Sequence, residues 1–217
     1  MKYKNILKGK FKIRLNRFIA IVNIDGNDET VHVKNTGRCR ELLIPGSRVY
    51  LSQSDNPARK TKYDLVAVYK KGLGLVNIDS QAPNQVVKEW LLLQDWDRII
   101  PEYKFENSRF DFYLEKGSRR VFIEVKGCTL EIDGTGYFPD APTERGTRHL
   151  RELARAVSEG FECYVVFVIQ MPKVAKVRPN AATDPAFAKA LEDAKAAGVN
   201  VLCLQCDVKK DELKIRQ

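Results

Sequence analysis

Two carboxylates and a lysine are predicted on neighbouring strands, where they could bind a metal ion and activate water. The segments RFDFYLE (109–115) and RVFIEVKG (120–127) have the pattern of strands, and the Gly-Ser pair between them is typical of a two-residue hairpin turn. The first strand carries Asp111, and the second carries Glu124 and Lys126. In the register that such a turn imposes, Asp111 lies opposite Glu124 on the same face, with Cβ atoms about 5 Å apart.

The facing carboxylates of Asp111 and Glu124 would repel each other unless a proton or a cation lay between them. Oxygen ligands favour Mg²⁺ or Mn²⁺, so the pattern predicts that the pair holds one of these ions. Lys126 points to the same face, where it could orient or deprotonate water or stabilise charge on a phosphoryl group. Glu89, on a helix ahead of the strands, is expected to add a carboxylate. The alternative is a structural charge cluster on a solvated sheet face.

The elements that must position these side chains are predicted in the order α-β-β-β-α-β, followed by one more helix and strand. A helix through VVKEWLLL has Asn84 as its expected N-cap, and a strand at roughly 98–106 follows it. A second helix begins near Thr143, and the run CYVVFVIQ is a fully buried strand. On the strand that carries Asp111, the opposite face is expected to hold the apolar side chains of Phe110, Phe112 and Leu114.

The positive charge of the chain lies in its first 82 residues. The chain of 217 residues has 37 Lys and Arg, 28 Asp and Glu, and a formal net charge of +9. Residues 1–82 hold 16 basic and 7 acidic side chains, whereas residues 83–217 hold 21 of each. This asymmetry indicates a basic domain at 1–82 that binds a polyanion, by default DNA, joined to a neutral domain at 83–217. A charged surface that serves only solubility is the simpler alternative.

Short strands separated by turns suit residues 1–82 to a small OB-type β-barrel, a frequent nucleic-acid platform. The strands are expected at 18–25, 30–34, 48–52, 62–69 and 74–79. Aromatic residues lie among basic ones, which suits base stacking, although aromatics in strands more often belong to a core; they are Phe18, Tyr50, Tyr63 and Tyr69. The expected DNA contacts of this domain are Arg14, Arg17, Arg38, Arg48, Lys60 and Lys62.

The helix that begins near Thr143 offers further polar side chains. Its N-terminus attracts anions, so Arg145 and Arg148 are expected to contact DNA phosphates. His149 either reaches a phosphate or water or is a helix-surface histidine. In the basic domain, the polar loop Asn35, Thr36, Gly37 and Arg38 either holds phosphates or forms a tight supporting turn.

Two resemblances follow from these residues. Asp111, followed a dozen residues later by Glu124-x-Lys126 in an α-β-β-β-α-β order, resembles the PD-(D/E)xK nuclease superfamily, although Phe110 stands where many members have Pro. Over nearly the whole chain, segments such as VHVKNTGRCRELLIPG, NSRFDFYLE, FIEVKGCTLE and FPDAPTERGTRHLREL are similar to the sugar fermentation stimulation protein A (SfsA) family. That resemblance implies DNA binding and a mixed α/β fold, with an OB-like barrel followed by a restriction-endonuclease-like domain.

Three functions are consistent with these observations. The first is a DNA-binding protein with a metal-dependent phosphodiesterase site. The second is a non-catalytic DNA-binding regulator on a nuclease-like fold, linked to sugar metabolism as the family name implies. The third is an RNA-binding or RNA-processing protein, since OB modules bind either polymer.

The sequence also predicts a cytoplasmic protein that does not cross a membrane. The longest apolar run, Cys163 to Ile169, is far shorter than a membrane span. The first residues show no signal peptide, and five scattered cysteines indicate reduced thiols.

Overall fold

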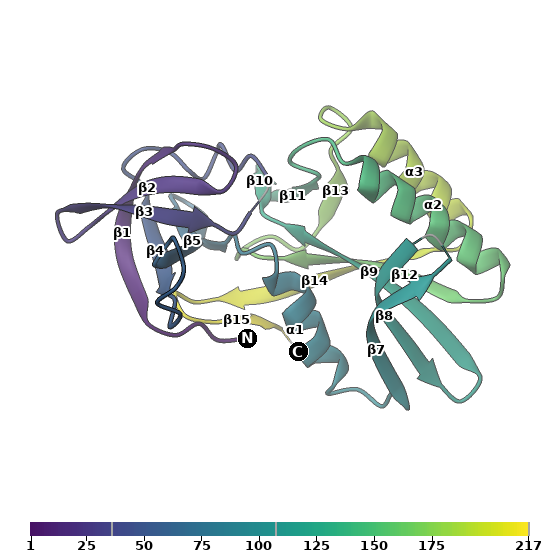
Figure 1. Cartoon of the computed structure of the whole chain (residues 1–217). Helices are drawn as coiled ribbons and strands as arrows, with labels where there is room; N and C mark the ends of the chain where they lie inside the picture. Colours follow the sequence, from purple (N-terminus) through teal and green to yellow (C-terminus); the bar gives the residue numbers. More distant parts are fainter. Residues whose placement is uncertain (36, 107, 217) are drawn as a thin grey trace.

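The computed structural model describes residues 1–35, 37–106 and 108–216 and has two parts that lie side by side (Figure 1). The first part contains β1 (Ile6–Arg14), β2 (Ile19–Ile24), β3 (Asn27–Val33), β4 (Arg48–Gln53), β5 (Tyr63–Lys70) and β6 (Gly74–Asn77). The strand order is β3-β2-β1-β4-β5-β6, and a parallel pairing of β3 with β5 closes the first five strands into a barrel. This is the predicted OB-like barrel.

Strand β1 lies outside the strand ranges that the sequence predicts. Its outward positions are largely lysines, and its fully buried inward positions are Gly9 and Phe11, so it shows little apolar alternation. Gly9 is needed there because a Cβ atom would lie 2.5 Å from Cγ1 of Val22 on the neighbouring strand. The barrel core also takes in apolar side chains from the second part of the chain, among them Ile169 and Met171.

The second part is a six-stranded sheet with helices on both faces. The sheet contains β7 (Arg98–Phe105), β8 (Ser108–Lys116), β9 (Arg119–Cys128), β12 (Glu162–Ile169), β14 (Asn200–Val208) and β15 (Leu213–Ile215), in the order β15-β14-β12-β9-β8-β7. Strands β9, β12 and β14 are parallel, and the others pair antiparallel. Helix α1 (Ala82–Leu91) packs on one face, and α2 (Glu144–Ser158) and α3 (Pro185–Ala196) pack on the other. The predicted order α-β-β-β-α-β is therefore present.

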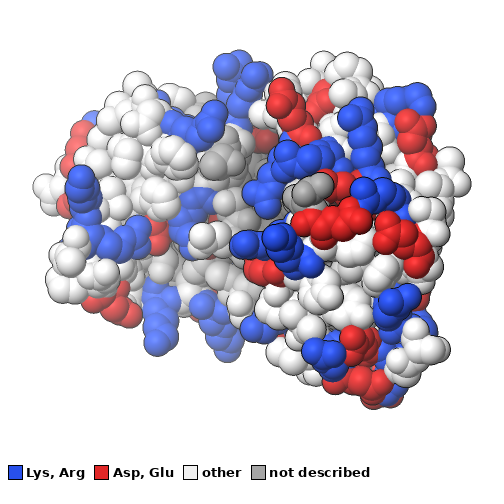
Figure 2. Space-filling view, turned by 45° about the vertical axis from the view of Figure 1, so that its right-hand side comes forward, with Lys and Arg blue, Asp and Glu red and all other residues white. Residues whose placement is uncertain are grey.

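A small third sheet joins the two parts. It contains β10 (Leu130–Ile132), β11 (Thr135–Phe138) and β13 (Val177–Pro179), none of which the sequence predicted. Figure 2 shows a hollow between the two parts, and Lys and Arg side chains gather along both of its sides. Among the described residues, no helix has the length and apolar character needed to cross a membrane.

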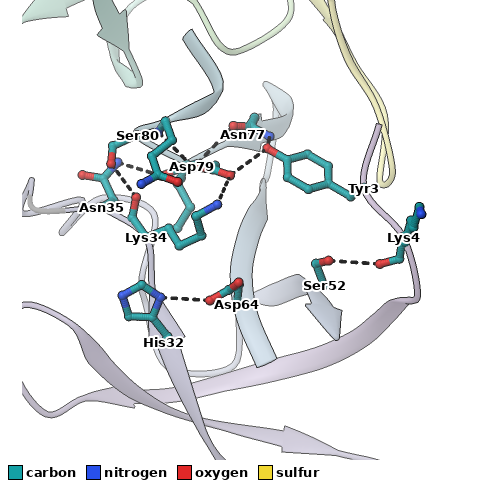
Figure 3. Close-up of polar contacts among 12 residues, drawn as sticks. Tyr3, Lys4, His32, Lys34, Asn35, Ser52, Asp64, Asn77, Asp79 and Ser80 are labelled. Atoms are coloured by element: carbon teal, nitrogen blue, oxygen red, sulfur yellow. Dashed lines mark hydrogen bonds and ion pairs between the residues drawn. The ribbon is translucent and has the colours of Figure 1, made fainter. Parts of the chain in front are cut away.

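A buried polar network ties the barrel to the start of α1 (Figure 3). The carboxylate of Asp79, which is fully buried, accepts hydrogen bonds from Lys34 Nζ (2.8 Å) and from the hydroxyl of Tyr3 (3.2 Å). The Asn77 amide donates to the same hydroxyl at 2.9 Å, and the Gln170 amide donates to Asn77 Oδ1, also at 2.9 Å. Because these side chains come from both parts, directional hydrogen bonds as well as apolar contacts position the barrel against the sheet.

The first residues of the chain contact the second part. The amino group of Met1 donates to the Leu213 carbonyl (2.9 Å), and Lys2 forms an isolated β-bridge with Glu212. The barrel strands end at Asn77, and α1 begins at Ala82. A division into domains 1–82 and 83–217 stays a prediction.

Candidate metal site and the cleft beside it

The β8–β9 hairpin has the register that its Gly-Ser turn predicts. The partners run from Lys116↔Arg119 to Phe112↔Ile123. Gly117 has φ 56°, the left-handed region that the first position of such a turn requires. The regular ladder ends at Phe112, one residue before Asp111 reaches its predicted partner on β9.

At Asp111 the strand β8 changes the face to which its side chains point. Phe112 and Leu114 pack on the α1 face, whereas Phe110 packs with the side chains of α2 and α3. The prediction that these three apolar residues share one face is therefore wrong. Strand β7 is irregular at the same level, because Glu102 has a left-handed φ of 53° between two regularly paired neighbours. A strict period of two cannot describe strands that are twisted locally in this way.

The Asp111 carboxylate takes the place of the missing ladder partner. Its Oδ2 accepts a hydrogen bond from the Val125 N–H (2.7 Å), and its Oδ1 accepts one from the amide of Asn84 (2.7 Å). The prediction of Asn84 as a helix N-cap is wrong. The N-cap of α1 is Gln81, which makes no side-chain capping bond. Asn84 therefore faces the candidate site and fixes Asp111.

Glu124 is buried, and its two oxygens differ in their surroundings. Oε1 is hydrogen-bonded to Lys126 Nζ (2.5 Å) and to Nδ1 of His149. Oε2 is buried and has no hydrogen-bond partner among the described residues. An unpartnered buried carboxylate oxygen is costly, and a bound cation would remove that cost.

The two carboxylates have opposite pKa shifts. Burial, with the charge of Glu124 as the next contribution, raises the pKa of Asp111 to about 6. Burial also acts to raise the pKa of Glu124, but the charge of Lys126 and the hydrogen bond from His149 outweigh it and lower that pKa. The site thus holds one carboxylate whose pKa is lowered and one whose pKa is raised, and a bound cation would favour the ionised form of both.

His149 lies against Glu124 and is buried, so it is not a helix-surface histidine. Arg145 Nε donates to His149 Nε2 (3.4 Å), so the imidazole carries its proton on Nδ1 and donates it to Glu124. Helical spacing in the sequence could have indicated that His149 is buried. It precedes the buried Leu153 by four residues, which places both side chains on the same face of the helix.

Glu89 does not lie with the other predicted site residues. Its carboxylate binds the amino group of Met1 (2.5 Å) and the amide of Gln85 (3.0 Å). Glu102, which the sequence did not indicate, lines the same hollow as Asp111 and Glu124.

Within the described residues, no three His, Cys, Asp or Glu side chains converge closely enough to hold a metal ion. Two carboxylates completed by water or phosphate oxygens are what Mg²⁺ commonly accepts, so the donor set fits such an ion.

The hollow that contains the carboxylates continues into an arginine-lined cleft. Ser80 lines both this hollow and a second one that extends to Arg17 and Gly37. A third hollow shares Arg17 and Gly37 and adds Arg38 and Arg40. Through these shared residues the three hollows adjoin one another and form a path along the junction of the two parts. Arg145 stands at the carboxylate end of the path.

The predicted DNA contacts fall into separate places. Arg17 and Arg38 line the cleft, Arg145 lines the carboxylate hollow, and Arg148 is exposed on α2. Arg40 also lines the cleft and was missed. The remaining predicted contacts line neither the cleft nor the carboxylate hollow; they are Arg48, stacked on Tyr69 at 4.7 Å, and the exposed Lys60 and Lys62. Thr36 of the predicted phosphate loop lies outside the described residues.

Arg14, also a predicted contact, lines the cleft, but its guanidinium is already hydrogen-bonded within the protein. It makes hydrogen bonds of 2.6–3.2 Å to the backbone carbonyls of Asn16, Arg17, Asn35, Gly37 and Arg38. These bonds use all five guanidinium N–H groups. Arg14 therefore shapes the rim of the cleft, and a bond to a DNA phosphate would require one of these contacts to break.

Comparisons with known proteins agree over the whole chain. Residues 13–78 match the family model of the SfsA N-terminal OB domain, and residues 81–212 match that of the sugar fermentation stimulation protein RE domain. The chain is 54% identical to a sugar fermentation stimulation protein homolog of Clostridium beijerinckii, with 100% of this chain and 97% of that protein covered. A homolog from Desulfitobacterium hafniense is 55% identical, with 99% and 95% covered.

A solved structure gives the same result for the fold. The structure of Pyrococcus furiosus SfsA in complex with Ca²⁺ is 29% identical, has a TM-score of 0.87, and covers 100% of this chain and 95% of that one. These matches confirm the mixed α/β fold, with an OB-like barrel followed by a restriction-endonuclease-like domain.

Proposed function

The chain belongs to the sugar fermentation stimulation protein (SfsA) family, and we propose that it binds DNA and hydrolyses its phosphodiester bonds with a divalent metal ion. The observation that carries this proposal is a pair of carboxylates at the end of the arginine cleft, the buried Glu124 and the half-buried Asp111, with Glu124 Oε2 unpartnered among the described residues. The Ca²⁺ in the complex of the Pyrococcus furiosus relative is a hard cation that prefers oxygen ligands, which supports a divalent ion here.

In this proposal Asp111 and Glu124 hold Mg²⁺ or Mn²⁺. When bound, such an ion polarises a phosphoryl oxygen and makes a bound water more acidic. Lys126, only 13% exposed and held by Glu124, places its ammonium where it orients the attacking water or stabilises charge on the phosphate. Asn84 and His149 keep the two carboxylates in position through their hydrogen bonds.

The cleft supplies the DNA-binding surface in the proposal. Arg17, Arg38 and Arg40 from the barrel and Arg145 from α2 would bind backbone phosphates, which carry no sequence information. The basic residues 1–82 would bind the strand, and residues 83–217 would cut it. Five free cysteines support a cytoplasmic location.

A non-catalytic DNA-binding regulator is the second candidate. It is favoured by the absence of a third convergent ligand among the described residues, since Glu89 lies elsewhere. RNA is the alternative polymer, and competition between labelled DNA and unlabelled RNA of the same sequence separates the two.

The experiment that tests catalysis is Lys126→Ala. We expect metal-dependent cleavage of DNA to fall by at least about 100-fold, because a preorganised charge at the phosphate is lost. DNA affinity, measured by fluorescence polarisation without metal, should change by less than about 3-fold because the cleft is intact. Lys195→Ala, an exposed lysine at the end of α3, is the matched control.

Cleavage at the wild-type rate by Lys126→Ala would remove Lys126 from the mechanism. Wild-type protein that binds DNA but cuts no substrate with Mg²⁺ or Mn²⁺ would establish the regulator instead.

A further inference from the structure

The turn between β1 and β2 exposes large apolar side chains. Leu15 and Phe18 stand at the two ends of this four-residue turn, and their exposed fractions are 57% and 50%. Ile13, at the end of β1, is 53% exposed. Single exposed apolar residues are common on protein surfaces, but three within six residues form a local apolar tip.

The backbone of this turn is held in place while its side chains stay exposed. Asn16 Oδ1 accepts hydrogen bonds from the N–H groups of Phe18 (2.9 Å) and Ile19 (3.0 Å). The carbonyl of Phe18 accepts one from the Val33 N–H (2.7 Å). The Arg14 guanidinium binds the carbonyls of Asn16 and Arg17. The ring of Phe18 is thus presented on an ordered turn, which lowers the entropic cost of binding a partner to it.

The surroundings of the turn indicate the chemistry of that partner. Asn16 and Arg17, the middle residues of the turn, line the arginine cleft together with Arg38 and Arg40. A partner must therefore offer anionic groups to the arginines and a flat apolar face to Phe18. Nucleic acid offers both only where its bases are unstacked, because in an intact duplex the base faces contact each other.

We propose that the turn Leu15–Phe18 packs on unpaired bases, so that the preferred substrate is DNA with a single-stranded or unpaired segment. This inference rests on the proposed DNA-binding function and names its substrate class. Phe18 stacks on a base, Leu15 contacts a neighbouring base or sugar, and Arg17 binds the adjoining phosphate. Arg17 of this turn lines two of the three adjoining hollows, and the third contains Asp111 and Glu124, so a strand bound at Arg17 can extend towards the two carboxylates.

The test compares the affinities of the full-length protein for three DNAs of equal length, measured by fluorescence polarisation in EDTA so that no DNA is cut. The DNAs are a single strand, a fully paired duplex, and a duplex with a short unpaired loop. Phe18→Ala should weaken binding to the first and third by about 10-fold and to the paired duplex by less than about 2-fold. Phe18→Trp should restore the affinity. Leu93→Ala, which removes an apolar side chain that is 68% exposed beyond the end of α1, should change none of the three.

The outcomes separate this inference from the proposed function. If the wild-type protein binds DNA but Phe18→Ala loses no affinity, or loses it equally for all three DNAs, the stacking proposal alone is overturned. If the wild-type protein binds none of the DNAs, the proposed function fails and this inference fails with it. If Phe18→Trp keeps the wild-type affinity for the two DNAs with unpaired bases, Phe18 makes a stacking contact rather than having a structural role.

Discussion

The chemistry of the candidate site depends on the different surroundings of two carboxylates. Glu124 is ionised because Lys126 and His149 bind one of its oxygens, while its other oxygen is buried and has no partner among the described residues. Asp111 is held by Asn84 and by the Val125 N–H, and burial raises its pKa. A divalent cation would offset the negative charge of both carboxylates in the folded protein. We therefore expect metal binding to stabilise the folded state.

Metal titration followed by thermal unfolding checks this expectation. The melting temperature of the wild-type protein should rise with Mn²⁺ or Ca²⁺, by the equivalent of about 2.7 kcal/mol at a hundredfold excess over Kd. Glu124→Gln should abolish the rise because it removes the unpartnered anionic oxygen. The shift on adding metal is the readout, since the variant also changes the baseline stability.

Glu89→Gln is the matched control. The sequence predicts Glu89 as a metal ligand, whereas the structure places it away from Asp111 and Glu124. It should keep the full metal-induced rise because Glu89 binds the amino group of Met1 and Gln85. If the metal-induced rise in melting temperature is lost in this variant, Glu89 is a metal ligand after all.

At the scale of elements, short connecting segments rather than strands shape the cleft. The β1–β2 turn and the loop after β3 are joined by the guanidinium of Arg14, which bonds to backbone carbonyls of both. Arg17 lies in the same turn but projects an exposed side chain along the cleft. Two nearby arginines of the basic domain therefore have different roles, which net charge does not reveal.

Alanine variants of these two arginines should separate stability from DNA binding. Arg14→Ala leaves several backbone carbonyls without their charged donor and should lower the free energy of unfolding by about 2 kcal/mol, measured by urea denaturation. Arg17→Ala should change it by less than about 0.5 kcal/mol but weaken DNA binding several-fold. Equal stability of the two variants would contradict the structural role of Arg14.

At the scale of the whole molecule, the charge asymmetry acquires a geometric meaning. The basic barrel and the neutral sheet meet along the cleft, so arginines of one part and carboxylates of the other can contact the same ligand. The buried network around Asp79 holds this arrangement, because Lys34 and Tyr3 reach it from the barrel side and Gln170 bonds to its carbonyl (3.1 Å).

Asp79→Asn tests how much the junction contributes to stability. Removing one partner of a buried ion pair leaves Lys34, which is 21% exposed, without its counterion, so we expect a loss of about 3 kcal/mol in urea denaturation. Asp55→Asn, at an exposed carboxylate that accepts from Asn5, should cost less than about 0.5 kcal/mol. A small effect of Asp79→Asn would mean that the ion pair of Asp79 with Lys34 contributes little to the stability of the junction.

Local patterns determined the hairpin that carries the candidate site. A two-residue Gly-Ser turn admits one register, so the pairs from Lys116↔Arg119 to Phe112↔Ile123 follow from counting along the chain. The ladder ends before Asp111, whose carboxylate accepts from the Val125 N–H instead of lying in a regular pair opposite Glu124. The order of helices and strands was likewise visible, because apolar periodicity is a local property. The weakly apolar β1 and the short strands β10, β11, β13 and β15 were not visible, since tertiary packing rather than their own sequence makes them strands.

Only the tertiary structure decided which side chains complete the site. Asn84, His149 and Glu102 reach it, and Glu89 does not, because helix orientation and a left-handed residue in β7 set these positions. Each depends on contacts between elements far apart in the chain, which no period within one element encodes. The sequence by itself determined the hairpin and the charge of the barrel; the packing of α1 and α2 on opposite faces of the sheet decided what surrounds the carboxylates.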